Sequence, residues 1–115
     1  MNEAARLDAV FAALSDPTRR ALMARLARGE ATVSELNEPF GISQPAISKH
    51  LRVLEDAGLI TQAKDGQRRP RTLVLGGPLE DVERWLAPFR AQWEQRLDRM
   101  ASFVEKKAAR KGTDR

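Results

Sequence analysis

Residues 43–60, "SQPAISKHLRVLEDAGLI", decide how this chain folds. Three apolar residues in this stretch recur at the spacing of one helix face: Ile47, Leu51 and Leu54. The pattern predicts an amphipathic helix over about 44–57, capped by Ser43 and ended by Gly58. The opposite face is less ordinary, because its first turns carry hydroxyl, amide and basic side chains where a solvated helix usually alternates Glu with Lys. This composition raises the question of whether the helix contacts another molecule.

A second, shorter helix is predicted immediately before this one. Ser34 is a favourable N-cap for it, Pro39 limits its length, and Gly41 marks a turn. The two helices, at about 34–40 and 44–57, are then joined by a turn of about three residues that contains glycine, which is the helix-turn-helix pattern.

Two β-strands are predicted after the long helix. The segments "LITQAK" (59–64) and "RTLVL" (71–75) flank "DGQRRP", in which Asp65-Gly66 favours a hairpin turn, although the loop is longer than two residues. A helix-turn-helix followed by a β-hairpin is a winged helix, so the expected fold class is mainly α with a small β-hairpin. Four basic residues fall at the tip of this wing, at about 64–71: Lys64, Arg68, Arg69 and Arg71.

Further helices are predicted on both sides of this winged region. Residues 3–14 carry apolar side chains at helical spacing: Leu7, Val10, Phe11 and Leu14. The following helix begins with Asp16 as its N-cap and Pro17 as its first residue, and Gly29 can end it.

The segment 78–108 carries more apolar surface than a terminal helix of one small domain needs. Its apolar residues follow one another at spacings of three or four, close to a heptad seam: Leu79, Val82, Leu86, Phe89, Trp93, Leu97, Met100 and Val104. Pro88 is expected to kink or split this helix. Two interpretations stay open, because the helix either covers its own core or forms a dimer interface with the first helix. We expect residues 1–108 to form one winged domain with its dimerisation helices, and residues 109–115 to be a disordered basic tail.

Charge is unevenly distributed along the 115 residues, which carry a net charge of +4. Residues 43–72 hold 6 basic against 3 acidic groups, and residues 105–115 hold 5 against 2. Such asymmetry indicates a polyanionic partner, although the tail alone could simply be solubilising. The N-terminus does not resemble a secretory signal and no apolar run is long enough to span a membrane, so the expected location is the cytoplasm.

The residue types disfavour several kinds of site. Without cysteine the chain has no disulfide, no thiolate metal ligand and no thiol nucleophile, and its single histidine disfavours a zinc site. That residue, His50, lies inside a predicted helix without a positioned nucleophile, and the chain has no phosphate-binding glycine loop, so we expect neither metal, cofactor nor enzyme activity. His50 is expected either to contact phosphate or to pack against the neighbouring helix.

The polar face of the helix at 44–57 suits the major groove of DNA, which recognition helices contact through their N-terminal half. Gln44 suits adenine, and Lys49 suits guanine or phosphate. The hydroxyls of Ser43 and Ser48 can bond either base. Wing arginines suit phosphates and the narrow minor groove. Arg19 and Arg20 could also reach phosphates, or simply pair with a nearby carboxylate or solvent. The alternative is a winged domain that binds protein and leaves this polar face solvated.

The stretch "LSDPTRRALMARLARGEATVSELNEPFGISQPAISKHLRVLEDAGLI" at residues 14–60, with the wing that follows, resembles the ArsR/SmtB family of bacterial winged-helix repressors. The resemblance covers about residues 5–76. The segment "LEDVERWLAPFRAQWEQRLDRM" looks like the long last helix of a subgroup without metal sensing. The resemblance implies a homodimer that binds a palindromic operator in double-stranded DNA and represses transcription.

The resemblance also implies which residues contact DNA and which contact the second subunit. On the helix at 44–57 the implied DNA contacts are Ser43, Gln44, Pro45, Ser48, Lys49, His50 and Arg52, and on the wing they are Lys64, Arg68, Arg69 and Arg71. The implied dimer contacts lie on the first and last helices: Leu7, Val10, Phe11, Leu86, Phe89, Trp93, Leu97 and Met100.

The sequence departs from the metal-sensing members of that family. Their cysteine pair is replaced by "TVSEL" before the turn, and the last helix has no histidine. We therefore expect a metal-independent regulator without a thiol redox switch, whose effector, if it has one, the sequence does not identify.

Overall fold

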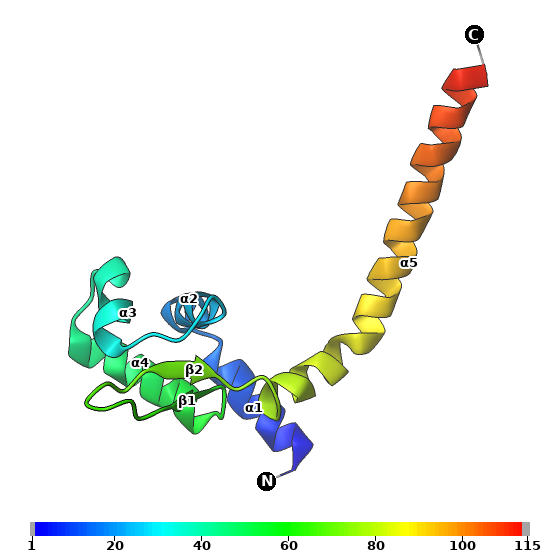
Figure 1. Ribbon diagram of the computed structural model, residues 1–115. Coiled ribbons are helices and arrows are strands. Elements are labelled where there is room, and N and C mark those ends of the chain that lie inside the picture. Colours follow the sequence, from blue (N-terminus) through cyan, green and yellow to red (C-terminus); the bar gives the residue numbers. More distant parts are fainter. Residues whose placement is uncertain (1, 114–115) are drawn as a thin grey trace. The chain divides into compact units, whose positions relative to one another are not determined.

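The computed structural model describes residues 2–113, with side chains up to residue 110, as five helices and one two-stranded sheet (Figure 1). The helices are α1 (Glu3–Ala13), α2 (Pro17–Leu26), α3 (Val33–Phe40), α4 (Gln44–Asp56) and α5 (Pro78–Thr113), and the strands are β1 (Ile60–Gln62) and β2 (Arg71–Leu73). The chain divides into two compact units, one ending at Val82 and the other starting at Glu83. The predicted fold class, mainly α with a small hairpin, is confirmed.

Side-chain caps explain where α2, α3 and α4 begin. Asp16 and Ser43 accept hydrogen bonds from the backbone amides three residues further on, as the sequence predicts. The predicted cap of α3, Ser34, is wrong. Thr32 and Glu35 form a capping box instead: the Thr32 hydroxyl accepts from the Glu35 amide (3.3 Å), and the Glu35 carboxylate accepts from the Thr32 amide (3.2 Å).

The helix-turn-helix consists of α3 and α4, close to their predicted bounds. Gly41 ends α3 with φ +65°, a left-handed conformation that glycine adopts without steric cost. Pro39 lies inside the last turn of α3, where it ends the helix soon afterwards. After this short turn, α4 has one face buried against the core and the other face exposed.

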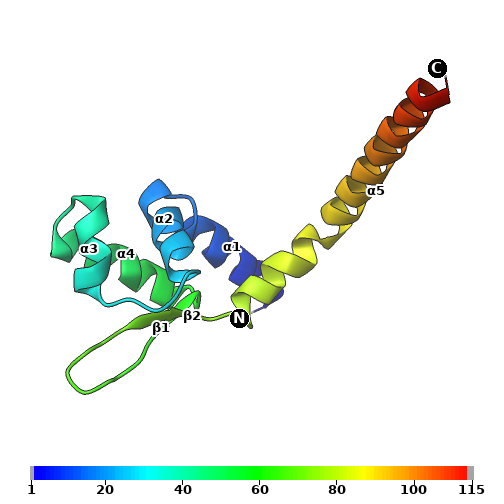
Figure 2. The same cartoon turned by 45° about the horizontal axis from the view of Figure 1, so that its top comes forward.

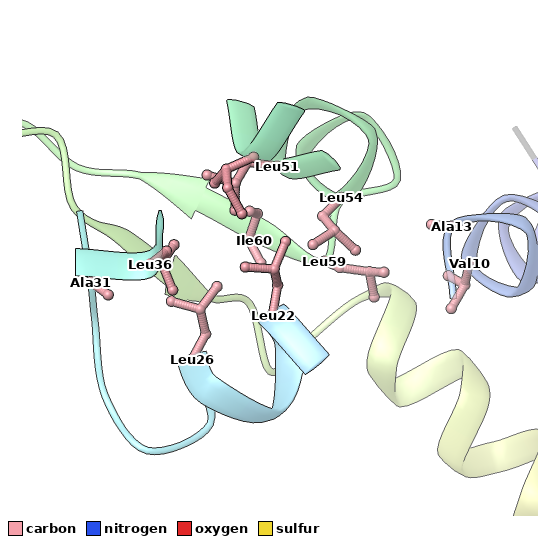
Figure 3. Close-up of a cluster of buried hydrophobic side chains, with 11 residues drawn as sticks. Val10, Ala13, Leu22, Leu26, Ala31, Leu36, Leu51, Leu54, Leu59 and Ile60 are labelled. Carbon is pink, nitrogen blue, oxygen red and sulfur yellow. The ribbon is translucent and has the colours of Figure 1, made fainter. Parts of the chain in front are cut away.

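The core of the first unit is built from one buried face of each helix and the start of β1. Figure 3 shows side chains of α2, α3, α4 and β1 directed towards one another: Leu22, Leu26, Leu36, Leu51, Leu54 and Ile60. The predicted stripe of α4, with Ile47 as its third member, is completely buried. Burial of one leucine of this kind contributes about 1.5–3 kcal/mol relative to its exposure, so the stripe fixes the orientation of α4.

The hairpin forms the wing, with shorter strands than predicted. Ile60 pairs with Leu73 and Gln62 with Arg71, so the predicted outer ends of both strands fall outside the ladder. At the tip, Asp65 and Arg68 exchange two backbone hydrogen bonds of 2.9 and 3.2 Å around a two-residue turn. Figure 2 shows this hairpin extending away from the helices of the first unit.

The first turn of α5 belongs to the core of its own chain. Leu79 and Val82 pack against the buried cluster, which favours the own-core interpretation for this end of the stripe. Asp81 is only 2% exposed, and the Arg6 Nε donates to its Oδ2 at 2.8 Å. This hydrogen bond and the carboxylate charge raise the pKa of Arg6. The ion pair links α1 to the start of α5.

The second unit is the remainder of α5. The helix continues through Pro88, so of the two predicted outcomes, a kink or a split near residue 87, the structure excludes the split. It also continues over residues 109–113, where a disordered tail was expected, while residues 114–115 lie outside the described part. From Phe89 onward its large apolar side chains are about half exposed or more.

Candidate nucleic-acid interface

The outer face of α4 presents a continuous set of exposed side chains. They lie at positions i, i+1, i+4, i+5 and i+8 of one helix face: Gln44, Pro45, Ser48, Lys49 and Arg52. We call this set the recognition face. The buried stripe on the other side holds the helix on α2 and α3, so the recognition face is presented on a rigid support.

Polar side chains of the recognition face, and of Ser43 just before it, form only weak contacts within the chain. The Ser43 Oγ accepts from the Ala46 amide at 3.3 Å, and its hydroxyl proton stays available as a donor. The Gln44 Nε2 donates to the Ser34 Oγ at 3.5 Å, a long bond that leaves the amide easy to redirect. Arg52 lies 3.8 Å from Asp56 across an exposed i,i+4 pair, which contributes little to stability.

His50 lies outside the recognition face and packs against the start of α2. Its Nδ1 lies 3.4 Å from the Arg19 Nη1 and 3.9 Å from the Asp16 Oδ2, and the side chain is 24% exposed. Arg19 also donates to the carbonyls of Ala12 and Ala13. The structure therefore favours the packing alternative for this histidine, and we remove His50 from the predicted DNA contacts. The Arg19 guanidinium is held by the same contacts within the chain.

Asp16 connects this cluster to the capping of α2. The hydrogen bond from the Arg19 amide, followed by the charges of His50 and Arg19, lowers the pKa of Asp16 below its ordinary value of 3.8. A lowered pKa means that the folded state prefers the charged carboxylate. Asp16 therefore stabilises the fold above its ordinary pKa, and this contribution is lost as the pH falls through the lower value of the folded state.

Substitution of Asp16 tests this assignment. We expect Asp16→Ala to lower the melting temperature at neutral pH, because it removes both the cap and the charge. Asp16→Asn is expected to fall between that variant and the original chain, because the amide oxygen still caps the helix. Thermal unfolding followed by circular dichroism between pH 7 and pH 3 would show the original chain and Asp16→Asn converging in acid. A constant difference between them at all pH values would contradict the role given to the charge.

The wing carries basic side chains that are paired to different extents. The Arg68 guanidinium lies 3.2 Å from the Glu35 Oε1 and 3.6 Å from the Asp65 Oδ2, so two carboxylates already balance it. Arg69 donates only to the backbone carbonyls of Gly66 and Arg68, at 3.1 and 3.0 Å. Lys64 is exposed on the same hairpin. Arg69 and Lys64 are therefore the wing cations best placed for a polyanion.

Glu35 was not among the predicted site residues. Hydrogen bonds from the Thr32 amide and hydroxyl, together with Arg68, lower the pKa of Glu35 and keep it charged at neutral pH. The capping-box pattern identifies Glu35 as a helix residue, but its contact with Arg68 joins positions 33 residues apart and has no local pattern in the sequence.

Arg71 does not lie at the wing tip, and the prediction that it does is wrong. Its side chain is 13% exposed, and its Nε donates to the Glu55 Oε1 at 3.1 Å. Its backbone exchanges hydrogen bonds of 2.8 and 3.1 Å with Ala31, just before α3. Arg71 thus links the wing to α4 and to the start of the helix-turn-helix, and it acts as a structural connection.

A hollow lies between α4 and the hairpin. Its walls contribute hydroxyl, amide and charged side chains: Ser48, Lys49, Arg52, Glu55, Gln62 and Arg71. Gln62, on an exposed position of β1, adds a hydrogen-bonding group that was not predicted. Among the described residues no group of three His, Cys, Asp or Glu side chains is arranged to hold a metal ion. None of the described helices is long and apolar enough to cross a membrane.

Comparison with known sequences places this arrangement among regulators. A family described as a helix-turn-helix domain matches residues 14–63. The chain is 45% identical over 58 residues to the transcriptional repressor SdpR of Bacillus subtilis, which covers 50% of this chain and 64% of that protein. It is 34% identical over 90 residues to the arsenic resistance transcriptional regulator ArsR1 of Pseudomonas putida, covering 69% of this chain and 70% of that one. The chain spans 64%, 58% and 46% of the lengths of the first three curated relatives that it matches.

Solved structures agree with the sequence relatives. The chain is similar to the ArsR family transcriptional regulator RHA00566, with 45% identity, a TM-score of 0.67 and coverage of 79% of this chain and 93% of that one. It is also similar to a homodimeric winged helix-turn-helix DNA-binding domain from Mycobacterium bovis, with 26% identity, a TM-score of 0.60 and coverage of 82% and 83%. The named relatives are transcriptional regulators, which agrees with the expectation that this chain is not an enzyme.

Proposed function

Because this chain belongs to the ArsR family of winged helix-turn-helix transcriptional regulators, we propose that it represses transcription by binding double-stranded DNA as a homodimer. The observation that carries the proposal is the recognition face of α4, which is polar, exposed and held in place by a buried stripe on its other side. A helix built in this way enters the major groove and contacts bases through its first turns.

The proposed base and phosphate contacts follow from the chemistry of this face and of the wing. Gln44 suits adenine, and Lys49 suits guanine or a phosphate. Ser43, Pro45, Ser48 and Arg52 complete the contact surface of α4. On the wing, Lys64 and Arg69 contact phosphates or the minor groove. Arg68 contacts DNA only when its ion pairs with Glu35 and Asp65 break.

The proposed homodimer has two recognition helices that contact an inverted repeat, with half-sites about 10 bp apart. The homodimeric state of the Mycobacterium bovis domain supports this arrangement. Leu7 is half-buried and Phe11 is 41% exposed on α1, so both remain in the proposed dimer interface. Val10 is completely buried in its own core and leaves that set. On α5 the proposed interface residues are Leu86, Phe89, Trp93, Leu97 and Met100.

The proposed regulator responds to no metal ion and acts in the cytoplasm. The chain has no cysteine, and its one histidine is engaged with Arg19 and Asp16. DNA affinity, measured by fluorescence anisotropy, is therefore expected to be the same when zinc ions, arsenite or a metal chelator is added. A tenfold loss of affinity in either ion would contradict metal independence and leave DNA binding itself intact.

Selection of bound duplexes from a random pool tests the function most directly. An inverted repeat is expected to emerge, and size-exclusion chromatography at micromolar protein is expected to show a dimer. If every duplex bound equally well at fixed salt, the chain would not be a sequence-specific repressor. If the chain were a monomer at that concentration and on the DNA, the homodimer would be wrong.

Substitution of Arg69 tests the wing. Because Arg69 is exposed and paired only with backbone carbonyls, Arg69→Ala is expected to weaken binding to all duplexes by a similar factor. The slope of log affinity against log salt is expected to fall by about 1, as for the loss of one phosphate contact. Arg68→Ala is the matched control, and its effect is expected to be smaller because Glu35 and Asp65 balance that charge. A change of base preference without a change of salt slope in Arg69→Ala would contradict the phosphate role.

A further inference from the structure

The second half of α5 separates its positive and negative charges around the helix. At about 100° per residue, the acidic residues Asp98 and Glu105 lie about 140–160° from Phe103, on the opposite side of the helix. Exposed basic residues instead lie within about 60° of Phe103. With Phe103 they form a set that we call the basic band: Arg96, Arg99, Lys106, Lys107 and Arg110.

This separation is not the pattern of a helix that is stabilised by its own surface ion pairs. Such a helix places opposite charges three or four positions apart. Asp98 and Glu105 have no basic residue at either spacing, before or after them. The basic band is therefore a face of one sign, which fits a partner of the opposite sign.

Phe103 lies in the middle of the basic band and is 66% exposed. The Lys107 Nζ lies 5.9 Å from the centroid of its ring, so a cation and an apolar ring are presented at the same place. A shallow hollow lies on each side of Phe103. Among the described residues, both hollows are lined by basic and apolar side chains without any carboxylate: Phe103, Lys106, Lys107, Ala109 and Arg110 in one, and Arg96, Arg99, Met100, Phe103 and Val104 in the other.

The combination of cations with exposed apolar side chains fits an anionic membrane surface better than DNA. Non-specific DNA binding neutralises phosphates and needs cations alone, so it gives Phe103 no role. A helix that lies in a membrane interface uses both kinds of side chain. Its apolar residues enter the boundary between headgroups and acyl chains, and its lysines and arginines contact anionic lipids.

The basic band does not coincide with the dimer interface proposed above. Trp93 and Leu97 lie about 80–120° from Phe103 around the helix. The basic band therefore remains exposed when a second molecule covers the apolar stripe.

We infer that the basic band of α5 binds the surface of membranes that contain anionic phospholipids, with Phe103 at the acyl boundary and the five cations at lipid phosphates. This is a contact along the surface, and it agrees with the finding that none of the described helices can cross a membrane. The inference goes beyond the proposed repressor and does not depend on it.

Sedimentation of the full chain with lipid vesicles tests the inference. Each cation near an anionic surface contributes about fivefold in affinity. Vesicles of phosphatidylglycerol and phosphatidylcholine are therefore expected to bind the chain at least about tenfold more tightly than vesicles of phosphatidylcholine alone. Equal binding to both kinds of vesicle, or binding to neither, would overturn the inference.

Arg99→Gln and Arg90→Gln form a matched pair that locates the contact. Both remove one charge from the same helix, but Arg90 lies about 140° from Phe103 and pairs with Glu83 at 3.0 Å. Arg99→Gln is expected to weaken binding to the anionic vesicles by about fivefold, and Arg90→Gln by less than about twofold. An equal loss in the two variants would mean that the basic band is not the contact surface.

Phe103→Ser separates a membrane from DNA as the partner. It keeps every charge, so it is expected to weaken vesicle binding severalfold and to leave the affinity for unrelated duplexes unchanged. If Arg99→Gln weakened duplex binding while the original chain ignored anionic vesicles, the basic band would be a DNA contact and the inference would be wrong. Selection from random duplexes reports on the repressor separately, since vesicle binding without a selected sequence would overturn only the proposed function.

Discussion

Replacement of Leu51 by alanine is expected to lower the free energy of unfolding by about 2–5 kcal/mol, the range found for buried leucines. Leu51 is completely buried in the middle of α4, where its side chain faces those of α2 and β1. The first unit has only a small core, and whole domains of this kind are stable by about 5–15 kcal/mol. The substitution therefore removes a large share of the total free energy of unfolding. As a result, DNA binding is expected to fail at temperatures where the original chain still binds.

Val53→Ala is the matched control for this experiment. Val53 lies on the same helix but is 38% exposed, so its truncation is expected to change stability by less than about 0.5 kcal/mol. Urea unfolding followed by circular dichroism measures both variants on one scale. Similar losses in the two variants would mean that α4 is not held by its apolar stripe, and the support argued for the recognition face would be wrong.

The elements of the first unit could be predicted because their causes are local. Asp16 and Ser43 cap the helices that follow them, and three apolar residues of α4 at helical spacing all face the core. The cap of α3 was misplaced by two residues because Thr32 and Ser34 are both favourable caps. Only Thr32 has Glu35 three residues later, and that spacing completes a capping box.

The roles of three basic residues could not be predicted, because each depends on a tertiary contact. Arg68 contacts Glu35 across 33 positions, and Arg71 contacts Glu55 across 16. His50 meets Arg19, 31 positions away. In the sequence these residues resemble the other basic groups around them. Only the fold separates the cations that brace the wing and α4 from those that are exposed to a polyanion.

The last helix shows a different limit of the sequence. Its stripe is continuous from Leu79 to Val104, so both the own-core and the dimer interpretation were reasonable. The structure divides it: Leu79 and Val82 pack on the core, and the members from Phe89 onward are exposed. Periodicity identifies an apolar face, but it does not indicate which molecule covers that face.

Replacement of Lys49 by alanine is expected to have the largest effect on DNA recognition. Lys49 is exposed in the second turn of α4, at the centre of the recognition face, and it lines the hollow between α4 and the hairpin. Loss of a base contact is expected to cost about 1–3 kcal/mol on the preferred site and much less on unrelated duplexes. The ratio of the two affinities, measured at one salt concentration, therefore falls.

Lys49→Arg separates the two roles that Lys49 can have. Arginine keeps the positive charge and can also bond guanine. Binding to unrelated duplexes is therefore expected to stay unchanged, and the base preference at one position of the half-site is expected to sharpen towards guanine. If Lys49→Ala instead weakened every duplex equally and reduced the salt slope by about 1, Lys49 would be a phosphate contact. Base selection by α4 would then depend on Gln44 and its serines, and Gln44→Ala would become the variant that relaxes sequence preference. Because α4 is fixed by a buried stripe, either result reports on the chemistry of the recognition face and not on a shift of the helix.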